Sequence, residues 1–246
     1  DLQRQWIQGT GPGAKPNAAV ESSIRNVAYA LLSGADGWMF DGEDALGQVA
    51  TMSLDNQRNL KLANADDPIF LEQHLELTDG SITAYVLVEQ IEACFQLMEI
   101  RAALGRHFVG YNTGRWDYIN SVSDAMAWDP GFLNPNIDSI VMSYGYMRNY
   151  EDRVRRAVNT PDRNGNFALW QGGMEPNIPV GSEAGVEASM KRAVAGAERE
   201  QREGASGKWV SHWEMVHIVR PVWESAGEEN QIGREFLPLG YAETDA

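Results

Sequence analysis

The chain has 246 residues, which suits a single (β/α) barrel, a fold of about 250 residues. Its formal net charge of −15 disfavours nucleic acids and anionic membranes as partners, because both are polyanions. No stretch approaches the ~20 consecutive apolar residues of a membrane span. The composition is typical of an acidic cytoplasmic enzyme.

Apolar runs of strand length alternate with amphipathic stretches along the chain. The runs predict strands at Gly37–Phe40, Ala84–Val88, His107–Tyr111, Ser139–Ser143, Phe167–Trp170 and Lys208–Ser211. The amphipathic stretches predict helices at Val20–Leu32, Glu89–Leu104, Tyr146–Val158, Val186–Arg202 and Trp213–Ala226, with Gly204 as a stop signal for the fourth. This alternation predicts an α/β protein with a parallel sheet. Six strands fit a doubly wound sheet, and they are two short of a closed barrel.

Carboxylates follow three of the predicted strands at the point where each strand ends. Asp41, Glu43 and Asp44 come after the first strand, Glu89 after the second, and Asp117 soon after the third. Because the carboxyl ends of parallel strands lie on one side of the sheet, we expect these five groups to converge there. Oxygen-only ligands favour Mg²⁺ or Mn²⁺.

Each of these residues taken singly also has a structural interpretation. Glu89 suits the first turn of a helix, where the helix dipole favours a carboxylate. Asp117 suits a helix N-cap, and Asp41 and Asp44 suit a turn. Their joint occurrence at consecutive strand ends favours the metal site.

Several segments resemble the malate synthase family. GADGWMFDGEDALGQ is similar to the family's first-strand signature, and VLVEQIEACFQLMEIRAALGRHFVGYNTGRWDYINS to its most distinctive block. The family's two magnesium ligands, a Glu and an Asp, are 28 positions apart in this block, as are Glu89 and Asp117 (117 − 89 = 28). WQGGMEPNIPV resembles the family's Gly-Gly-Met segment. GKWVSHWEMV resembles its eighth-strand segment, with Trp213 where the family has proline.

The resemblance implies a TIM (β/α)8-type barrel in which strands 2 and 3 are missing from the printed chain. We expect a barrel domain at 1–226, and a tail at 227–246 that leads to an absent helical domain. Natural residues are then missing between 63 and 74. The alternative is a genuinely shortened homologue with an open sheet.

The resemblance also implies a reaction, the condensation of acetyl-CoA with glyoxylate and hydrolysis of the thioester, which gives malate and CoA. Glu89 and Asp117 then hold Mg²⁺ (or Mn²⁺), and the surrounding carboxylates are Asp41, Glu43 and Asp44, the first two holding metal-bound waters. Glyoxylate binds at Gly114, Arg115 and Trp116, where Arg115 has the alternative of packing under the site. Acetyl-CoA lies against Gly172, Gly173 and Met174.

Two catalytic parts of the family have no counterpart in the printed sequence. The family has an arginine near the end of its second strand, and an aspartate base in a C-terminal helical domain. We therefore expect the printed chain to be inactive. The alternatives are a malyl-CoA or citramalyl-CoA lyase of the same superfamily and a non-catalytic barrel homologue.

Overall fold

Parallel strands and the helices beside them make up the described part of this protein. The computed structural model describes residues 38–40, 76–81, 83–136, 139–227 and 230–233. These residues fall into two compact units. One holds the described residues up to Leu87 together with Arg101–Val109, and the other holds Val88–Ile100 together with the described residues from Gly110 onward.

The first unit contains β1 (Trp38–Phe40) and most of β2 (Ala84–Val88). These two strands pair in parallel, with Trp38 opposite Ala84 and Phe40 opposite Val86. Val86, Leu87 and Val88 are all buried, as expected for a parallel strand that is covered on both faces. The first two predicted strands are therefore confirmed.

The second unit contains two further strand pairs, which are also parallel. They join β3 (Phe108–Thr113) to β4 (Leu169–Glu175) and β4 to β5 (Gly207–Val210). Gly110 lies opposite Leu169, and Gly172 lies opposite Lys208. A register shift between Gly172 and Glu175 marks an irregularity in β4. The predicted parallel α/β class is confirmed.

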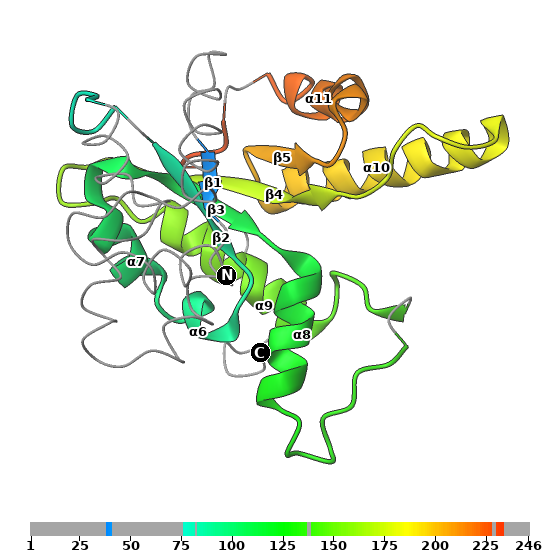
Figure 1. The fold of residues 1–246 in the computed structure, drawn as a ribbon, viewed down its shortest axis with the longest axis horizontal. Helices are drawn as coiled ribbons and strands as arrows, with labels where there is room; N and C mark the ends of the chain where they lie inside the picture. Colours follow the sequence, from blue (N-terminus) through cyan, green and yellow to red (C-terminus); the bar gives the residue numbers. More distant parts are fainter. Residues whose placement is uncertain (1–37, 41–75, 82, 137–138, 228–229, 234–246) are drawn as a thin grey trace, which may run out of the picture. The chain divides into compact units, whose positions relative to one another are not determined.

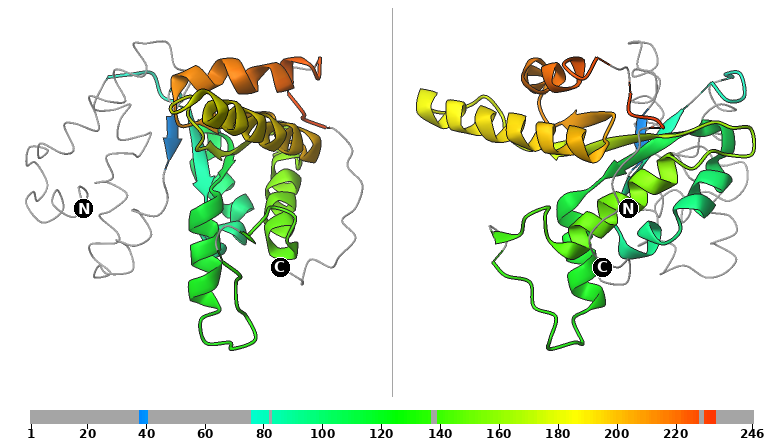
Figure 2. Two further views of the ribbon diagram at one scale, coloured as in Figure 1. Left: turned by 90° about the vertical axis from the view of Figure 1, so that its right-hand side faces the viewer. Right: turned by 180° about the vertical axis from the view of Figure 1, so that it is seen from behind.

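Helices of the second unit pack on these strands or on one another (Figures 1 and 2). They are α6 (Ile91–Cys94), α8 (Arg115–Ala125), α9 (Gly145–Val158), α10 (Glu183–Glu203) and α11 (Val216–Glu224). The helix α9 contacts β4 and α6, α10 contacts β4 and α11, and α11 contacts β5. A helix α7 (Leu97–Leu104) and the 3-10 turns η1 (Gly105–His107) and η3 (Trp213–Met215) complete the described elements.

The longest described helix, α10, has the two end signals that sequence reasoning uses. The Ser182 side chain caps its start by accepting a hydrogen bond from the Gly185 amide at 3.3 Å. Gly204 ends it in a left-handed conformation with φ 114°, which a residue without a β-carbon adopts at little cost. Among the described helices, none has the length and apolar character needed to cross a bilayer.

Two sequence predictions need correction. Ser139–Ser143 is not a strand: Ile140 is buried but Val141 is 46% exposed, and the segment forms turns before α9. In this apolar run, Ile140 is therefore the one buried side chain. The helix predicted at Glu89–Leu104 is two helices, α6 and α7, interrupted at Phe95 and Gln96. The helix Val20–Leu32 and the proposed gap between 63 and 74 lie outside the described residues.

Candidate metal centre

Glu89 is a buried carboxylate at the carboxyl end of a strand. It follows Val88, the last residue of β2, and is only 3% exposed. Helix α6 begins two residues later with Gln90 as its N-cap, so Glu89 is not a first-turn helix residue. Its side chain lies against Gly114, where an added β-carbon would be 2.4 Å from Glu89 Oε2. Glycine at position 114 is therefore what leaves room for this carboxylate.

Asp117 lies in the first turn of α8 and is exposed. The N-cap of this helix is Gly114, so the alternative of Asp117 as the N-cap is wrong. The first helical hydrogen bond runs from the Tyr118 amide to the Gly114 carbonyl at 3.3 Å. The amides of residues 115 to 117 come before it, and such amides favour negative charge at a helix start.

A backbone hydrogen bond joins the regions that carry these two carboxylates. The Gly114 amide donates to the Val88 carbonyl at 3.2 Å. Val88 directly precedes Glu89, and Gly114 lies three positions before Asp117. The end of β2 and the start of α8 are thereby held together, so both carboxylates leave the sheet at its carboxyl end, where α/β proteins build their sites.

The donor chemistry at this end of the sheet suits Mg²⁺ or Mn²⁺. Magnesium is commonly bound through one or two carboxylates and keeps several waters, and the space beside Gly114 is filled by the Glu89 carboxylate. Within the described ranges, no three His, Cys, Asp or Glu side chains gather as a metal site. Asp41, Glu43 and Asp44 lie outside those ranges. The metal role of Glu89 and Asp117 thus stays a prediction.

The side chain of Arg115 is partly buried and bonds to the protein's own backbone. Its guanidinium donates a hydrogen bond to the Ile140 carbonyl and stacks on the Trp116 ring, 4.4 Å from the ring centroid. Burial lowers the pKa of Arg115, and the nearby Arg199 adds to this effect. These contacts favour the alternative in which Arg115 packs under the site. They leave the backbone amides as the candidate carboxylate binders.

The Gly-Gly-Met segment lies in β4, and its glycines are sites of close approach. An added β-carbon would be 2.4 Å from Glu200 Oε2 at Gly172, and 2.6 Å from the Thr113 carbonyl oxygen at Gly173. Met174 is 42% exposed. Both glycines therefore have packing reasons of their own, and the role of this segment in binding acetyl-CoA stays a prediction.

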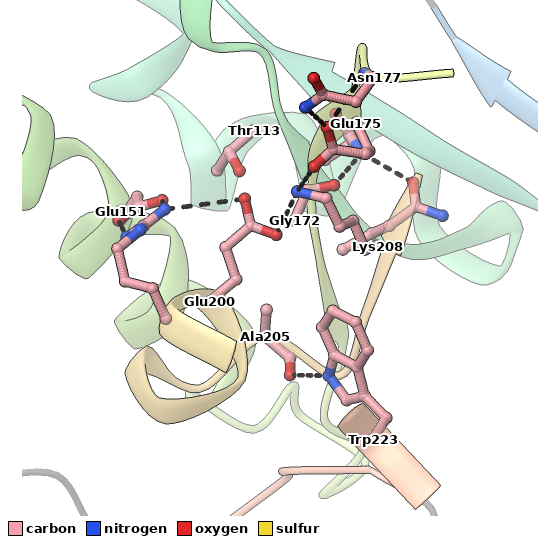
Figure 3. A network of polar contacts seen from close by, with 12 residues as sticks. Thr113, Glu151, Gly172, Glu175, Asn177, Glu200, Ala205, Lys208 and Trp223 are labelled. Carbon is pink, nitrogen blue, oxygen red and sulfur yellow. Dashed lines mark hydrogen bonds and ion pairs between the residues drawn. The ribbon is translucent and has the colours of Figure 1, made fainter. Parts of the chain in front are cut away.

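Sequence reasoning missed a buried cluster of charges beside this segment (Figure 3). Lys208 of β5 lies between Glu200 of α10, at 2.8 Å, and Glu175 of β4, at 3.7 Å. All three side chains are less than 10% exposed. No sequence pattern could have revealed this cluster, because residues 175, 200 and 208 form no local motif. The β4–β5 register brings Glu175 near Lys208, and the packing of α10 adds Glu200.

A second ion pair extends this cluster toward α9. Arg199 donates two hydrogen bonds to the Glu151 carboxylate, at 2.7 and 3.0 Å. Burial raises the pKa of Glu151, and it raises the pKa of Glu200 to about 7. At Glu200 the attraction of Lys208 acts in the opposite direction, but burial outweighs it. The cluster is therefore sensitive to pH near neutrality.

Comparison with known proteins decides the family. The family model described as malate synthase, TIM barrel domain, matches residues 55–236. This chain belongs to the malate synthase family. The matched family model is that of a TIM barrel domain, so the barrel class that the resemblance implied is confirmed.

Relatives in the malate synthase family are of moderate similarity. The chain is 36% identical to a glyoxysomal malate synthase of Zea mays over 165 residues, which cover 66% of this chain and 29% of that protein. It is 33% identical to a malate synthase of Streptomyces clavuligerus, over 68% of this chain and 30% of that protein. The chain thus spans about 30% of the length of the curated relatives that it matches.

A solved structure of a citrate lyase from Burkholderia xenovorans LB400 is similar in fold. The TM-score is 0.51, at 15% sequence identity, and the match covers 90% of this chain and 72% of that one. At this identity the likeness shows the fold alone.

Proposed function

We propose that this chain carries the substrate-side metal site of a malate synthase, which condenses acetyl-CoA with glyoxylate and hydrolyses the thioester with water to give malate and CoA. The observation that carries the proposal is the hydrogen bond from Gly114 to Val88, with the Glu89 carboxylate packed over Gly114. Membership of the malate synthase family supports this reaction. The barrel domain at 1–226, the Gly172–Met174 contact with acetyl-CoA and the cytoplasmic location stay predictions.

Glu89 and Asp117 would hold the cation. Mg²⁺, when bound, supplies a Lewis acid that polarises the aldehyde of glyoxylate. Glu89 brings a carboxylate whose position is limited by Gly114. Asp117 brings one from an exposed helix start, which the incoming substrate can reach.

The start of α8 would bind the glyoxylate carboxylate. Gly114 is the N-cap of this 11-residue helix, and its own amide is already bonded to Val88. The amides of Arg115 and Trp116 follow it in the first turn, where amide groups and the helix dipole favour an anion. The N-cap has no side chain that competes for these amides. The Arg115 side chain holds this segment in place by its hydrogen bond to the Ile140 carbonyl.

Metal titration of the full natural chain tests the site. Glu89→Gln and Asp117→Asn remove one charge each and should abolish Mg²⁺ and Mn²⁺ binding in calorimetry. Asp124→Asn, near the other end of α8, is the matched control and should bind like the natural protein. Natural affinity in both site variants would sink the proposal.

Product analysis separates the synthase from a lyase. A synthase releases malate and free CoA from acetyl-CoA and glyoxylate. Formation of acetyl-CoA and glyoxylate from malyl-CoA, with no free CoA, would instead identify a lyase with the same metal carboxylates.

A further inference from the structure

Tyr150 is a fully buried tyrosine of α9 that contacts a direct sequence neighbour of each candidate metal ligand. It is 0% exposed. Its hydroxyl donates a hydrogen bond to the Val88 carbonyl. Its ring stacks on Tyr118, with centroids 3.9 Å apart and planes 9° apart. Val88 directly precedes Glu89, and Tyr118 directly follows Asp117.

Three elements therefore meet at one carbonyl oxygen. The Val88 carbonyl accepts the Tyr150 hydroxyl from α9 and the Gly114 amide from the start of α8, and a carbonyl oxygen has two lone pairs to do so. The flat stack on Tyr118 adds a second contact between α9 and α8. Helix α9 thus contacts the backbone carbonyl that precedes Glu89 and the side chain that follows Asp117.

The surroundings keep the Tyr150 hydroxyl a donor. Burial raises its pKa well above the usual value, and the charge of Glu89 acts in the same direction. The neutral hydroxyl donates to the backbone carbonyl of Val88 at the end of β2. Buried tyrosine hydroxyls usually have such a hydrogen-bond partner. The raised pKa therefore keeps this hydroxyl protonated at neutral pH.

We propose that Tyr150 is a positioning residue that sets the separation of the Glu89 and Asp117 carboxylates for a divalent cation. This inference rests on the proposed function, because it needs a cation at those residues. Mg²⁺ requires near-ideal octahedral geometry at short distances, so a small shift of either carboxylate weakens binding. Groups that orient metal ligands from outside change metal affinity by about 10–100-fold when they are removed.

Tyr150→Phe tests the inference, because it removes the hydroxyl and keeps the stacked ring. Mg²⁺ and Mn²⁺ affinities are measured by calorimetry on the full chain, and the electron paramagnetic resonance spectrum of bound Mn²⁺ reports the ligand geometry. We expect an affinity loss of about 10-fold and an altered spectrum. The matched control is Tyr146→Phe in the same helix, whose hydroxyl donates to Asn134 at 3.2 Å, and which should leave both readouts unchanged.

A purely structural role for Tyr150 predicts a different result. Urea unfolding would then show a lower stability, while the cation affinity and the spectrum of the folded variant would match the natural protein, and this would overturn the inference. If Tyr150→Phe does not fold, Tyr118→Leu removes the stack instead, and unchanged affinity there overturns it equally.

The proposed function can fail separately. If Glu89→Gln abolishes binding while Tyr150→Phe binds normally, only the positioning role is wrong. If Glu89→Gln and Asp117→Asn both bind normally, the metal site itself is wrong.

Discussion

The Glu89 carboxylate occupies the space that a side chain at Gly114 would need. A β-carbon there would lie 2.4 Å from Glu89 Oε2 and 2.8 Å from Glu89 Cβ, well inside van der Waals contact. A buried carboxylate that directly follows a strand has little freedom to move aside. Gly114 is therefore tied to the position of Glu89 as well as to the start of α8.

Gly114→Ala should consequently weaken divalent-cation binding. We expect a loss of about 10-fold or more in Mg²⁺ affinity, because the new methyl group displaces the Glu89 carboxylate. Calorimetric titration measures it. Gly207→Ala is the control, since an added β-carbon there meets nothing within 4 Å. Equal affinities in the two variants would show that Glu89 adjusts freely or does not bind the cation.

Gly173→Ala should destabilise the sheet. Its β-carbon would lie 2.6 Å from the Thr113 carbonyl oxygen, which belongs to the backbone of β3 and cannot rotate away. Overpacking of this kind costs about 1–3 kcal/mol. Urea unfolding should show the loss for Gly173→Ala and a smaller change for Gly207→Ala in β5. A Gly173→Ala protein as stable as the natural one contradicts the close approach of these strands.

Lys208→Met should be strongly destabilising at pH 8. It leaves the buried Glu200 and Glu175 carboxylates without the ammonium group between them, and removing one partner of a buried ion pair costs about 3–5 kcal/mol. The exposed pair of Lys191 and Glu187 provides the comparison, because surface ion pairs contribute little. Lys191→Met should unfold like the natural protein. A similar small effect in both variants would argue against a buried cluster.

Glu200→Gln should remove a pH dependence of stability. The folded pKa of Glu200 is raised to about 7 from 4.5, so between these values the folded state binds a proton that the unfolded state has released. The contribution of Glu200 to stability is therefore largest at low pH and falls by roughly 2–3 kcal/mol from pH 5 to pH 8.

Urea unfolding at pH 5, 6, 7 and 8 measures this effect. The stability of Glu200→Gln relative to the natural protein should rise across that series. Glu187→Gln on the exposed part of α10 should show no such trend. A flat difference for Glu200→Gln means that its carboxylate keeps an ordinary pKa in the folded protein.

Local patterns were enough to predict several elements of the fold. The apolar run at Ala84–Val88 is a strand, and the stretch at Tyr146–Val158 is a helix that begins one residue earlier. Gly204 ends α10 as predicted. Such features depend on burial periodicity and end signals, which lie within a few neighbouring residues. The strand predicted at Ser139–Ser143 was wrong, because a short apolar run does not reveal whether another strand lies beside it.

The sequence by itself determined the family, the parallel α/β class and the pair Glu89 and Asp117 as candidate ligands, because these depend on residue types and spacing along the chain. Only the tertiary structure decided that Gly114 joins Val88, that Tyr150 contacts the neighbours of both carboxylates, and that Lys208 lies between Glu175 and Glu200. Those contacts join residues from separate strands and helices. Strand register and helix packing set them, and neither leaves a local mark in the sequence.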